Sequence, residues 1–130
     1  DVLNALGAYP GDPGAIGGEC AGVVVAVGAG VTGFAPGDEV LAMASGAFSQ
    51  YVTVDCAYVA HTPAGMRAVE AAALPTAFLT AYCGLRYLAQ MKPGDRVLIH
   101  AAAGGVGMAA VQLAQQAGGA NSCRYRGAGG

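Results

Sequence analysis

The 130-residue sequence predicts an α/β protein in which a small antiparallel β-unit is followed by the first strand and helix of a parallel sheet. Two observations predict this class. Several short apolar runs, separated by glycine and proline turns, lie between Ala21 and about His61, and closely spaced short strands are typical of antiparallel barrels. Beyond Arg96, an apolar run enters a glycine turn and continues with helical periodicity, which is the order of a βα unit.

The strand of this βα unit is expected at residues 97–99. These three aliphatic residues follow a Pro93-Gly94-Asp95 turn, and so short an apolar run is typical of a strand buried on both faces. The helix is expected over residues 106–117, because Gly118 can end it. Its apolar residues recur at helical spacing, namely Val106, Ala109, Ala110, Leu113 and Ala117.

The glycine turn between strand and helix is suited to the pyrophosphate of a dinucleotide, because N–H groups at a helix N-terminus face the phosphates. Gly105, Gly107 and Ala110 match the pattern G-x-G-x-x-A literally. Ala102, Gly104 and Gly107 place the motif directly at the end of the strand. We prefer this second register, since the tight turn must follow the strand at once. The alternative is a packing turn without a ligand.

The chain divides into three segments. Residues 1–65 hold the antiparallel unit, residues 66–118 hold the start of the parallel unit, and residues 119–130 carry no apolar run. In this last segment we expect disorder or an artefactual terminus. A helix is expected from Arg67 to Gln90, where four large side chains can share one face, namely Phe78, Tyr82, Leu85 and Leu88.

The length of the chain limits the parallel sheet. About thirty-five residues remain from Arg96 onward, whereas a doubly wound sheet needs two βαβαβ halves and one βαβ unit alone takes about thirty residues or more. The sheet is therefore predicted to be truncated. We interpret the chain as a piece of a larger protein.

Charge and composition exclude several classes of partner and site. The net charge is −2 without a basic run, so nothing favours nucleic acid. The sequence has no stretch of about eighteen unbroken apolar residues, which a membrane span would need. No secretory signal is visible either, so we expect a cytoplasmic location. Widely spaced cysteines without a CxxC pair predict free, mostly buried thiols, and two lone histidines are expected to be structural. These residues are Cys20, Cys56, Cys83, Cys123, His61 and His100.

The chain resembles the enoyl reductase domain of modular polyketide synthases, within the zinc-free medium-chain dehydrogenase/reductase superfamily. Five segments carry the resemblance, from Asp1 to about Gly118: DVLNALGAYPGDP, GGECAGVVVAVG, VTGFAPGDEV, AAALPTAFLTAYCGL and RVLIHAAAGGVGMAAVQLA. The resemblance implies a GroES-like barrel domain joined to a Rossmann cofactor domain. It also implies NADPH-dependent reduction of the α,β-double bond of an enoyl thioester on an acyl carrier domain, beside neighbouring polyketide synthase domains.

The resemblance assigns roles to three sites. Thr80 stands where zinc-free members place a threonine near the nicotinamide; the alternative is a helix hydroxyl bonded to a preceding carbonyl. Tyr9 stands where this family often has a tyrosine proposed to protonate the α-carbon; the alternative is an aromatic ring packed beside Pro10. The pyrophosphate loop is matched by Ala101, Ala102, Ala103, Gly104, Gly105, Val106 and Gly107.

Two departures concern metal and cofactor. Zinc-dependent relatives carry Gly-His-Glu where this chain has Gly17-Gly18-Glu19, so a histidine ligand is missing and no metal is expected. The acid that contacts an NAD ribose about twenty residues past the glycines is also missing, because no Asp or Glu follows Asp95. NADPH therefore fits better than NADH. Arg124 and Arg126 lie at about the right distance to meet its 2′-phosphate.

Two other functions stay open. One is a stand-alone zinc-free quinone or enone reductase of the same superfamily, without flanking synthase domains. The other is an inactive, truncated product that keeps the fold.

Overall fold

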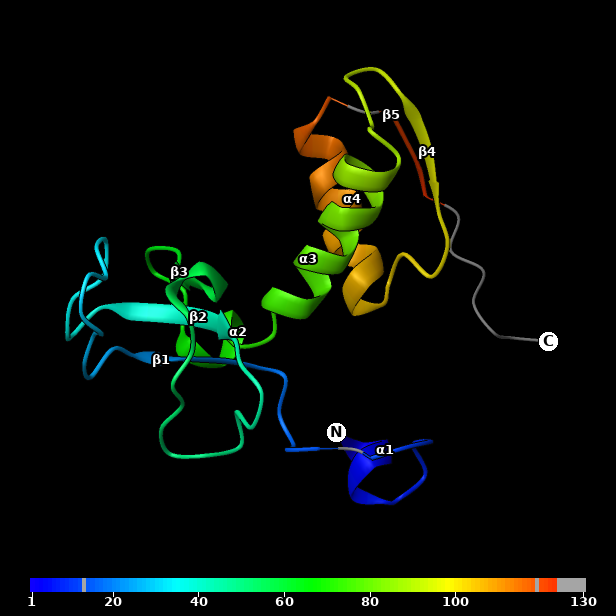
Figure 1. Ribbon diagram of the computed structural model, residues 1–130. Coiled ribbons are helices and arrows are strands. Elements are labelled where there is room, and N and C mark those ends of the chain that lie inside the picture. The colour runs from blue at the N-terminus through cyan, green and yellow to red at the C-terminus, as the bar shows by residue number, and fades with distance from the viewer. Residues whose placement is uncertain (13, 119, 124–130) are drawn as a thin grey trace. The chain divides into compact units, whose positions relative to one another are not determined.

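The chain folds into two units, Asp1–Pro75 and Thr76–Gly130, in which the computed structural model describes residues 1–12, 14–118 and 120–123 (Figure 1). Along the chain, the boundary between the two units falls after Pro75, whereas the sequence predicts a boundary after residue 65. This difference arises because the short helix α2 (Ala68–Ala71) contacts strands of the first unit. The α/β class, with an antiparallel part before a parallel part, is confirmed.

The first unit contains a three-stranded antiparallel sheet with the strand order β1-β2-β3. Its strands are β1 (Glu19–Val23), β2 (Glu39–Met43) and β3 (Val59–His61). The central strand β2 is bonded on both sides, since Leu41 pairs with Ala21 and with Ala60. Its Ala42 is buried. The short apolar runs therefore do form an antiparallel sheet.

Two of the apolar runs form less strand than the sequence predicts: one is only partly a strand and the other forms none. The run after β1 pairs only at Val24, whose N–H donates to the Asp38 carbonyl oxygen at 2.9 Å. Residues 48–54 form no strand, and there the Ser49 hydroxyl donates to the Gly46 carbonyl oxygen at 2.6 Å. A strand needs a neighbour for its backbone N–H and C=O groups. No described strand lies beside these two segments.

The predicted helix from Arg67 to Gln90 is divided into three pieces. These are α2, α3 (Pro75–Tyr82) and a π-helical segment η2 (Cys83–Leu88). Proline has no N–H to donate to a preceding turn and is favoured at the first helical position. Pro75 therefore begins α3, three residues after Ala72, the C-cap residue of α2.

The helical stretch Ala68–Leu88 is long and apolar enough to cross a membrane by length and composition alone, with a mean hydropathy of 1.3. In the structure Ala81 is buried, and Phe78 and Leu85 pack against the same hydrophobic cluster. The stretch therefore contributes to the core of the second unit. That the chain does not span a membrane stays a prediction.

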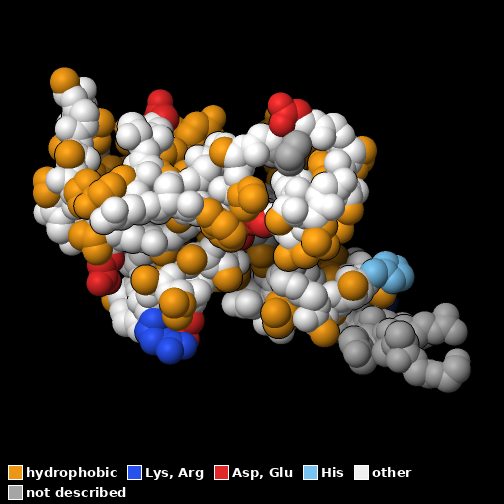
Figure 2. All heavy atoms as spheres, turned by 90° about the horizontal axis from the view of Figure 1, so that it is seen from below, with side chains coloured by type: hydrophobic (Ala, Val, Ile, Leu, Met, Phe, Trp, Pro, Cys, Tyr) orange, Lys and Arg blue, Asp and Glu red, His pale blue; other side chains and the backbone are white. Residues whose placement is uncertain are grey.

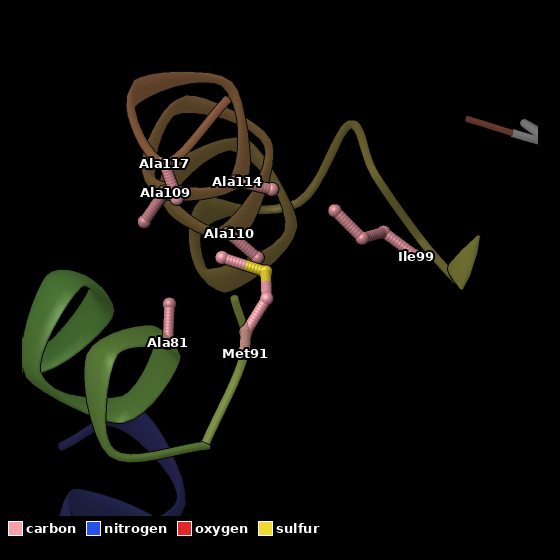
Figure 3. Packing of buried hydrophobic residues seen from close by; sticks show 7 residues of the cluster. All are labelled: Ala81, Met91, Ile99, Ala109, Ala110, Ala114 and Ala117. Carbon is pink, nitrogen blue, oxygen red and sulfur yellow. The ribbon is translucent and has the colours of Figure 1, made fainter. Parts of the chain in front are cut away.

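The second unit is built around helix α4 (Gly105–Gln116), which contacts η2 and strand β4 (Arg96–Ile99). The side chains of Met91 and Ile99 point toward α4 (Figure 3). Small alanine side chains on α4 allow this close approach. Seven buried residues form the core: Ala81, Met91, Ile99, Ala109, Ala110, Ala114 and Ala117.

One prediction for the βα unit is wrong in detail. Leu98 is 56% exposed, so the described residues cover β4 on one face only; Figure 2 shows other hydrophobic side chains at the surface. On α4, Val106 is exposed, whereas Ala109, Ala110 and Ala114 are buried. The predicted end of the helix is confirmed, because Gly118 has a φ of +73° and its N–H donates to the Gln115 carbonyl oxygen at 2.9 Å.

Strand β5 (Ala120–Cys123) pairs in parallel with β4 and places Ala120 beside Arg96. The sequence predicts disorder or an artefactual terminus here, whereas these four residues form a strand, because an available strand edge offers backbone partners even to a segment of weak strand propensity. The remainder of the expected tail, residues 119 and 124–130, lies outside the described residues. The possible 2′-phosphate contacts Arg124 and Arg126 lie there too.

Candidate functional site

The glycine turn after β4 connects the strand tightly to α4. Ala101 has a φ of +50°, and its carbonyl oxygen accepts a hydrogen bond from the Gly104 N–H at 2.9 Å. Gly104 is the N-cap of α4, and its carbonyl oxygen accepts from the Met108 N–H at 2.8 Å. The turn thus follows the strand directly.

Gly107 lies where no other residue type fits. A Cβ built on Gly107 would overlap the Ala101 carbonyl oxygen and lie 2.7 Å from the Ala102 Cα. The same atom on Gly104 would lie 3.4 Å from that oxygen, and on Gly105 it would meet nothing within 4 Å. In the dinucleotide fingerprint, the third small residue permits close packing of the helix. This geometry favours the register that ends at Gly107.

The N-terminus of α4 offers donors to an anion. The first N–H groups of a helix have no partner within it, and the helix dipole is positive at this end. No acidic side chain stands in the first turn, and Gly104, Gly105 and Val106 are exposed. Exposed backbone donors flanked by small residues suit a pyrophosphate. Residues 101–107 therefore fit the anionic part of a dinucleotide.

Thr80 lies in the same unit as this loop, on the exposed side of α3. Its side chain is exposed. Both roles considered for its hydroxyl, a contact to the nicotinamide and a bond to a preceding carbonyl, stay predictions.

Tyr9 lies in the first unit, directly after the short helix α1 (Val2–Ala5), and is 56% exposed. The Ala8 N–H donates to the Leu3 carbonyl oxygen at 2.8 Å, and the Gly7 N–H donates to the Asn4 carbonyl oxygen at 3.0 Å. With Gly7 at a φ of +64°, these two bonds make a Schellman motif. The motif determines the direction in which the chain leaves α1 toward Tyr9.

The Gly17-Gly18-Glu19 segment makes a tight turn before β1. Gly17 is buried with a φ of +94°, and a Cβ there would lie 2.7 Å from the Phe48 nitrogen. Its N–H donates to the Asp1 Oδ1 at 2.9 Å. Among the described residues, no group of three His, Cys, Asp or Glu could hold a metal ion. The absence of a catalytic zinc stays a prediction.

An open cleft of about 590 Å³ lies beside this turn, within the first unit. It carries carboxylates, hydroxyls and an amide that can hydrogen-bond a polar ligand. Sequence reasoning missed this cleft, because its residues come from four separate segments without a common motif. The polar lining residues are Asp1, Asn4, Ser45, Thr53, Asp55 and Tyr58.

His61 and Cys20, for which the sequence predicts structural roles, have surroundings that fit such roles. The His61 Nε2 lies 2.9 Å from the Gly33 carbonyl oxygen, and its ring stacks on Phe34 with centroids 4.9 Å apart. Burial raises the pKa of the Cys20 thiol, which favours the unreactive protonated form. The described cysteines are free, as predicted: Cys20, Cys56 and Cys83. The predicted burial is wrong for Cys56 and Cys83, which are exposed.

Comparisons with known proteins agree with this architecture. Residues 1–64 match the family of alcohol dehydrogenase GroES-like domains. The chain is 56% identical over 115 residues to the pikromycin polyketide synthase component PikAII of Streptomyces venezuelae, a match that covers 88% of this chain and 3% of that protein. The chain thus spans a small part of this curated relative.

Solved structures also have folds similar to that of this chain. The chain superimposes on the CurK enoyl reductase with a TM-score of 0.83 and 45% identity, covering 95% of this chain and 41% of that one. It superimposes on mycobacterial Rv1454c complexed with NADPH with a TM-score of 0.79 and 34% identity, covering 98% of this chain and 41% of that one. Residues 1–64 are thus similar to alcohol dehydrogenase GroES-like domains, and the whole chain is similar to part of a modular polyketide synthase and to part of a polyketide synthase enoyl reductase.

Proposed function

We propose that a complete domain carrying this chain reduces the α,β-double bond of an enoyl thioester with NADPH. The observation that carries this proposal is the loop geometry, in which Gly107 packs against Ala101 and the donors of α4 stay exposed. The 45% identity to the CurK enoyl reductase supports the reaction class. The NADPH complex of the related Rv1454c supports the choice of cofactor.

The chain's own residues have three roles in this proposal. The backbone N–H groups at the start of α4 hold the pyrophosphate, and the Thr80 hydroxyl contacts the nicotinamide. NADPH bound there supplies a hydride to the β-carbon of the substrate. Electron density then moves to the thioester oxygen as an enolate, and the Tyr9 phenol donates a proton to the α-carbon. Addition of the hydride and the proton completes the reduction without a metal.

The partners follow from the synthase relatives. We propose that the thioester is carried on an acyl carrier domain and that ketoreductase and carrier domains flank the reductase in the complete protein. The proposed location is the cytoplasm. The polar cleft beside Gly17 is the proposed approach for the thioester arm, whose amides and hydroxyl need hydrogen-bond partners.

A substrate comparison tests this function. A complete domain that carries this sequence is given NADPH with a crotonyl thioester of pantetheine and, in parallel, with a small quinone, and NADPH absorbance is followed. We expect turnover of the thioester and little turnover of the quinone. Turnover of the quinone alone would show a quinone reductase, and inactivity with both substrates despite NADPH binding would show a domain that has kept only the fold.

A further inference from the structure

The carboxylate of Asp1 does not cap the helix that it precedes. Asp1 is the N-cap of α1, a position where an aspartate side chain ordinarily accepts from the first turn of its own helix, but it makes no such bond. Its Oδ1 accepts from the N–H of Gly17, sixteen residues away, at 2.9 Å in a partly buried contact. The side chain therefore links two segments that are distant in the sequence.

The Gly17 end of this contact is held firmly. The Gly17 carbonyl oxygen accepts from the Ala47 N–H at 3.2 Å, and the Ile16 carbonyl oxygen accepts from the Phe48 N–H at 3.3 Å. The backbone of residues 47 and 48 approaches so closely that Gly17 has no room for a Cβ. Gly17 is thus anchored to the segment that follows β2.

The Asp1 end leads directly to Tyr9. The Asp1 carbonyl oxygen accepts from the Ala5 N–H at 2.8 Å, and the Schellman motif at Gly7 continues the hydrogen-bonded backbone to Ala8. Residues 1–8 are therefore joined by a continuous set of backbone hydrogen bonds. Tyr9 is the next residue, so an anchor at Asp1 restricts where its phenol can lie.

Apolar packing does not provide a second anchor within the described residues. The three large apolar side chains of this segment are mostly exposed, Val2 at 72%, Leu3 at 56% and Leu6 at 74%. A hydrogen bond to a charged acceptor is stronger than one between neutral groups. The hydrogen bond of the Asp1 carboxylate is accordingly a polar anchor between this segment and Gly17, two residues before β1.

We propose that Asp1 is a positioning residue, which holds the segment that carries Tyr9 against the Gly17 turn and so places the phenol for proton donation. This inference rests on the proposed function, because it gives Tyr9 the role of proton donor. Asp1 itself touches no reacting atom in this proposal.

Three variants of a complete domain test it. Asp1→Leu keeps the approximate shape and removes the acceptor, Asp1→Asn keeps an acceptor oxygen without the charge, and Asp12→Ala is a matched control that removes an exposed carboxylate of the same segment, whose bond to the Gly14 N–H is local. Hydrogen exchange of residues 2–12 is the first readout. We expect exchange about tenfold faster in Asp1→Leu, as for the loss of one charged hydrogen bond, a smaller increase in Asp1→Asn, whose neutral acceptor forms a weaker bond, and near-unchanged exchange in Asp12→Ala.

Kinetics separate positioning from general stability. With a 2-methyl-enoyl thioester, Asp1→Leu should lower kcat and mix the configuration of the methyl-bearing carbon, and Asp1→Asn, which keeps a neutral acceptor, should lie between Asp1→Leu and the parent. In a Tyr9→Phe background, Asp1→Leu should have no further effect on kcat. Additive losses in the double variant, or unchanged exchange in Asp1→Leu, would overturn the proposal.

Other outcomes are also decisive. If Asp1→Leu does not fold, exchange in the folded Asp1→Asn decides, because a weakened anchor must still raise exchange above that of Asp12→Ala and an equal rate rejects the anchor. If Tyr9→Phe alone changes nothing, Tyr9 is not the donor and the positioning role falls with it. A faster exchange in Asp1→Leu would then remain as a separate structural result.

Discussion

Gly107 in the first turn of α4 lies directly against the carbonyl oxygen of Ala101, so close that a Cβ on Gly107 would overlap that oxygen. The contact explains why a glycine stands inside a helix, where alanine is ordinarily more stable. It also brings the helix N-terminus onto the end of the preceding strand. The strand, the turn and the donors of α4 are therefore held in one arrangement.

Replacing Gly107 by Ala should disrupt this arrangement. The added methyl group must displace backbone atoms of Ala101, and overpacking of this kind costs about 1–3 kcal/mol of the free energy of unfolding. We expect this loss in chemical unfolding of a complete domain, together with weaker NADPH binding in a fluorescence titration.

Gly105→Ala is the matched control for stability. The new Cβ would meet nothing within 4 Å, so stability should stay equal or rise by up to about 1 kcal/mol, since alanine favours the helix. Equal unfolding free energies for the two variants would show that the close approach at Gly107 is not tight in solution.

The βα unit could be predicted from the sequence because its determinants are local. A proline-glycine turn precedes β4, small residues follow the strand, and Gly118 ends α4 with a positive φ. Each is a property of a few neighbouring residues. The register of the glycine motif was predicted for the same reason, since the turn had to follow the strand at once.

Contacts between distant segments could not be predicted in this way. The bond between Asp1 and Gly17 joins residues sixteen positions apart, and neither residue belongs to a pattern that indicates the other. The exposure of Leu98 depends on which elements cover β4, which its own apolar run does not reveal. Likewise, β5 forms on an available strand edge rather than from a strong strand sequence.

The 130-residue chain by itself should show little or no reductase activity. It covers 41% of the CurK enoyl reductase chain, and it leaves Leu98 on β4 and Val106 on α4 exposed. Apolar faces of this kind need a second layer to be stable. We expect NADPH turnover with a crotonyl thioester close to the background rate. A rate equal to that of a complete domain would contradict this prediction.

A complete domain should prefer NADPH to NADH. An NAD-binding site of this type uses a carboxylate about twenty residues past the glycines to bond the ribose hydroxyl, and no Asp or Glu follows Asp95 in this chain. Without that carboxylate, a 2′-phosphate meets no repulsion. Steady-state kinetics should give a higher kcat/KM with NADPH, and an equal or higher value with NADH would reject this interpretation.

Replacing Tyr9 by Phe in a complete domain tests the proton donor. The substitution removes the phenol hydroxyl and keeps the ring, and because Tyr9 is 56% exposed and follows the backbone bonds of the Gly7 motif, the free energy of unfolding should change little. Reduction should continue more slowly, by about ten- to a hundredfold, which is the low end of what a general acid contributes. Water or another residue then supplies the proton.

Stereochemistry gives the sharper readout. A donor fixed on one side of the substrate determines the configuration of an α-methyl branch, whereas a proton from water can arrive from either side. With a 2-methyl-enoyl thioester, Tyr9→Phe should therefore give a mixed or inverted product, measured by chiral chromatography. Tyr51→Phe is a matched control, since Tyr51 is also exposed, at 67%, and lies outside the proposed site. If Tyr9→Phe keeps both the parent rate and the parent configuration, as the control should, then the ring of Tyr9 only packs and the proton comes from elsewhere.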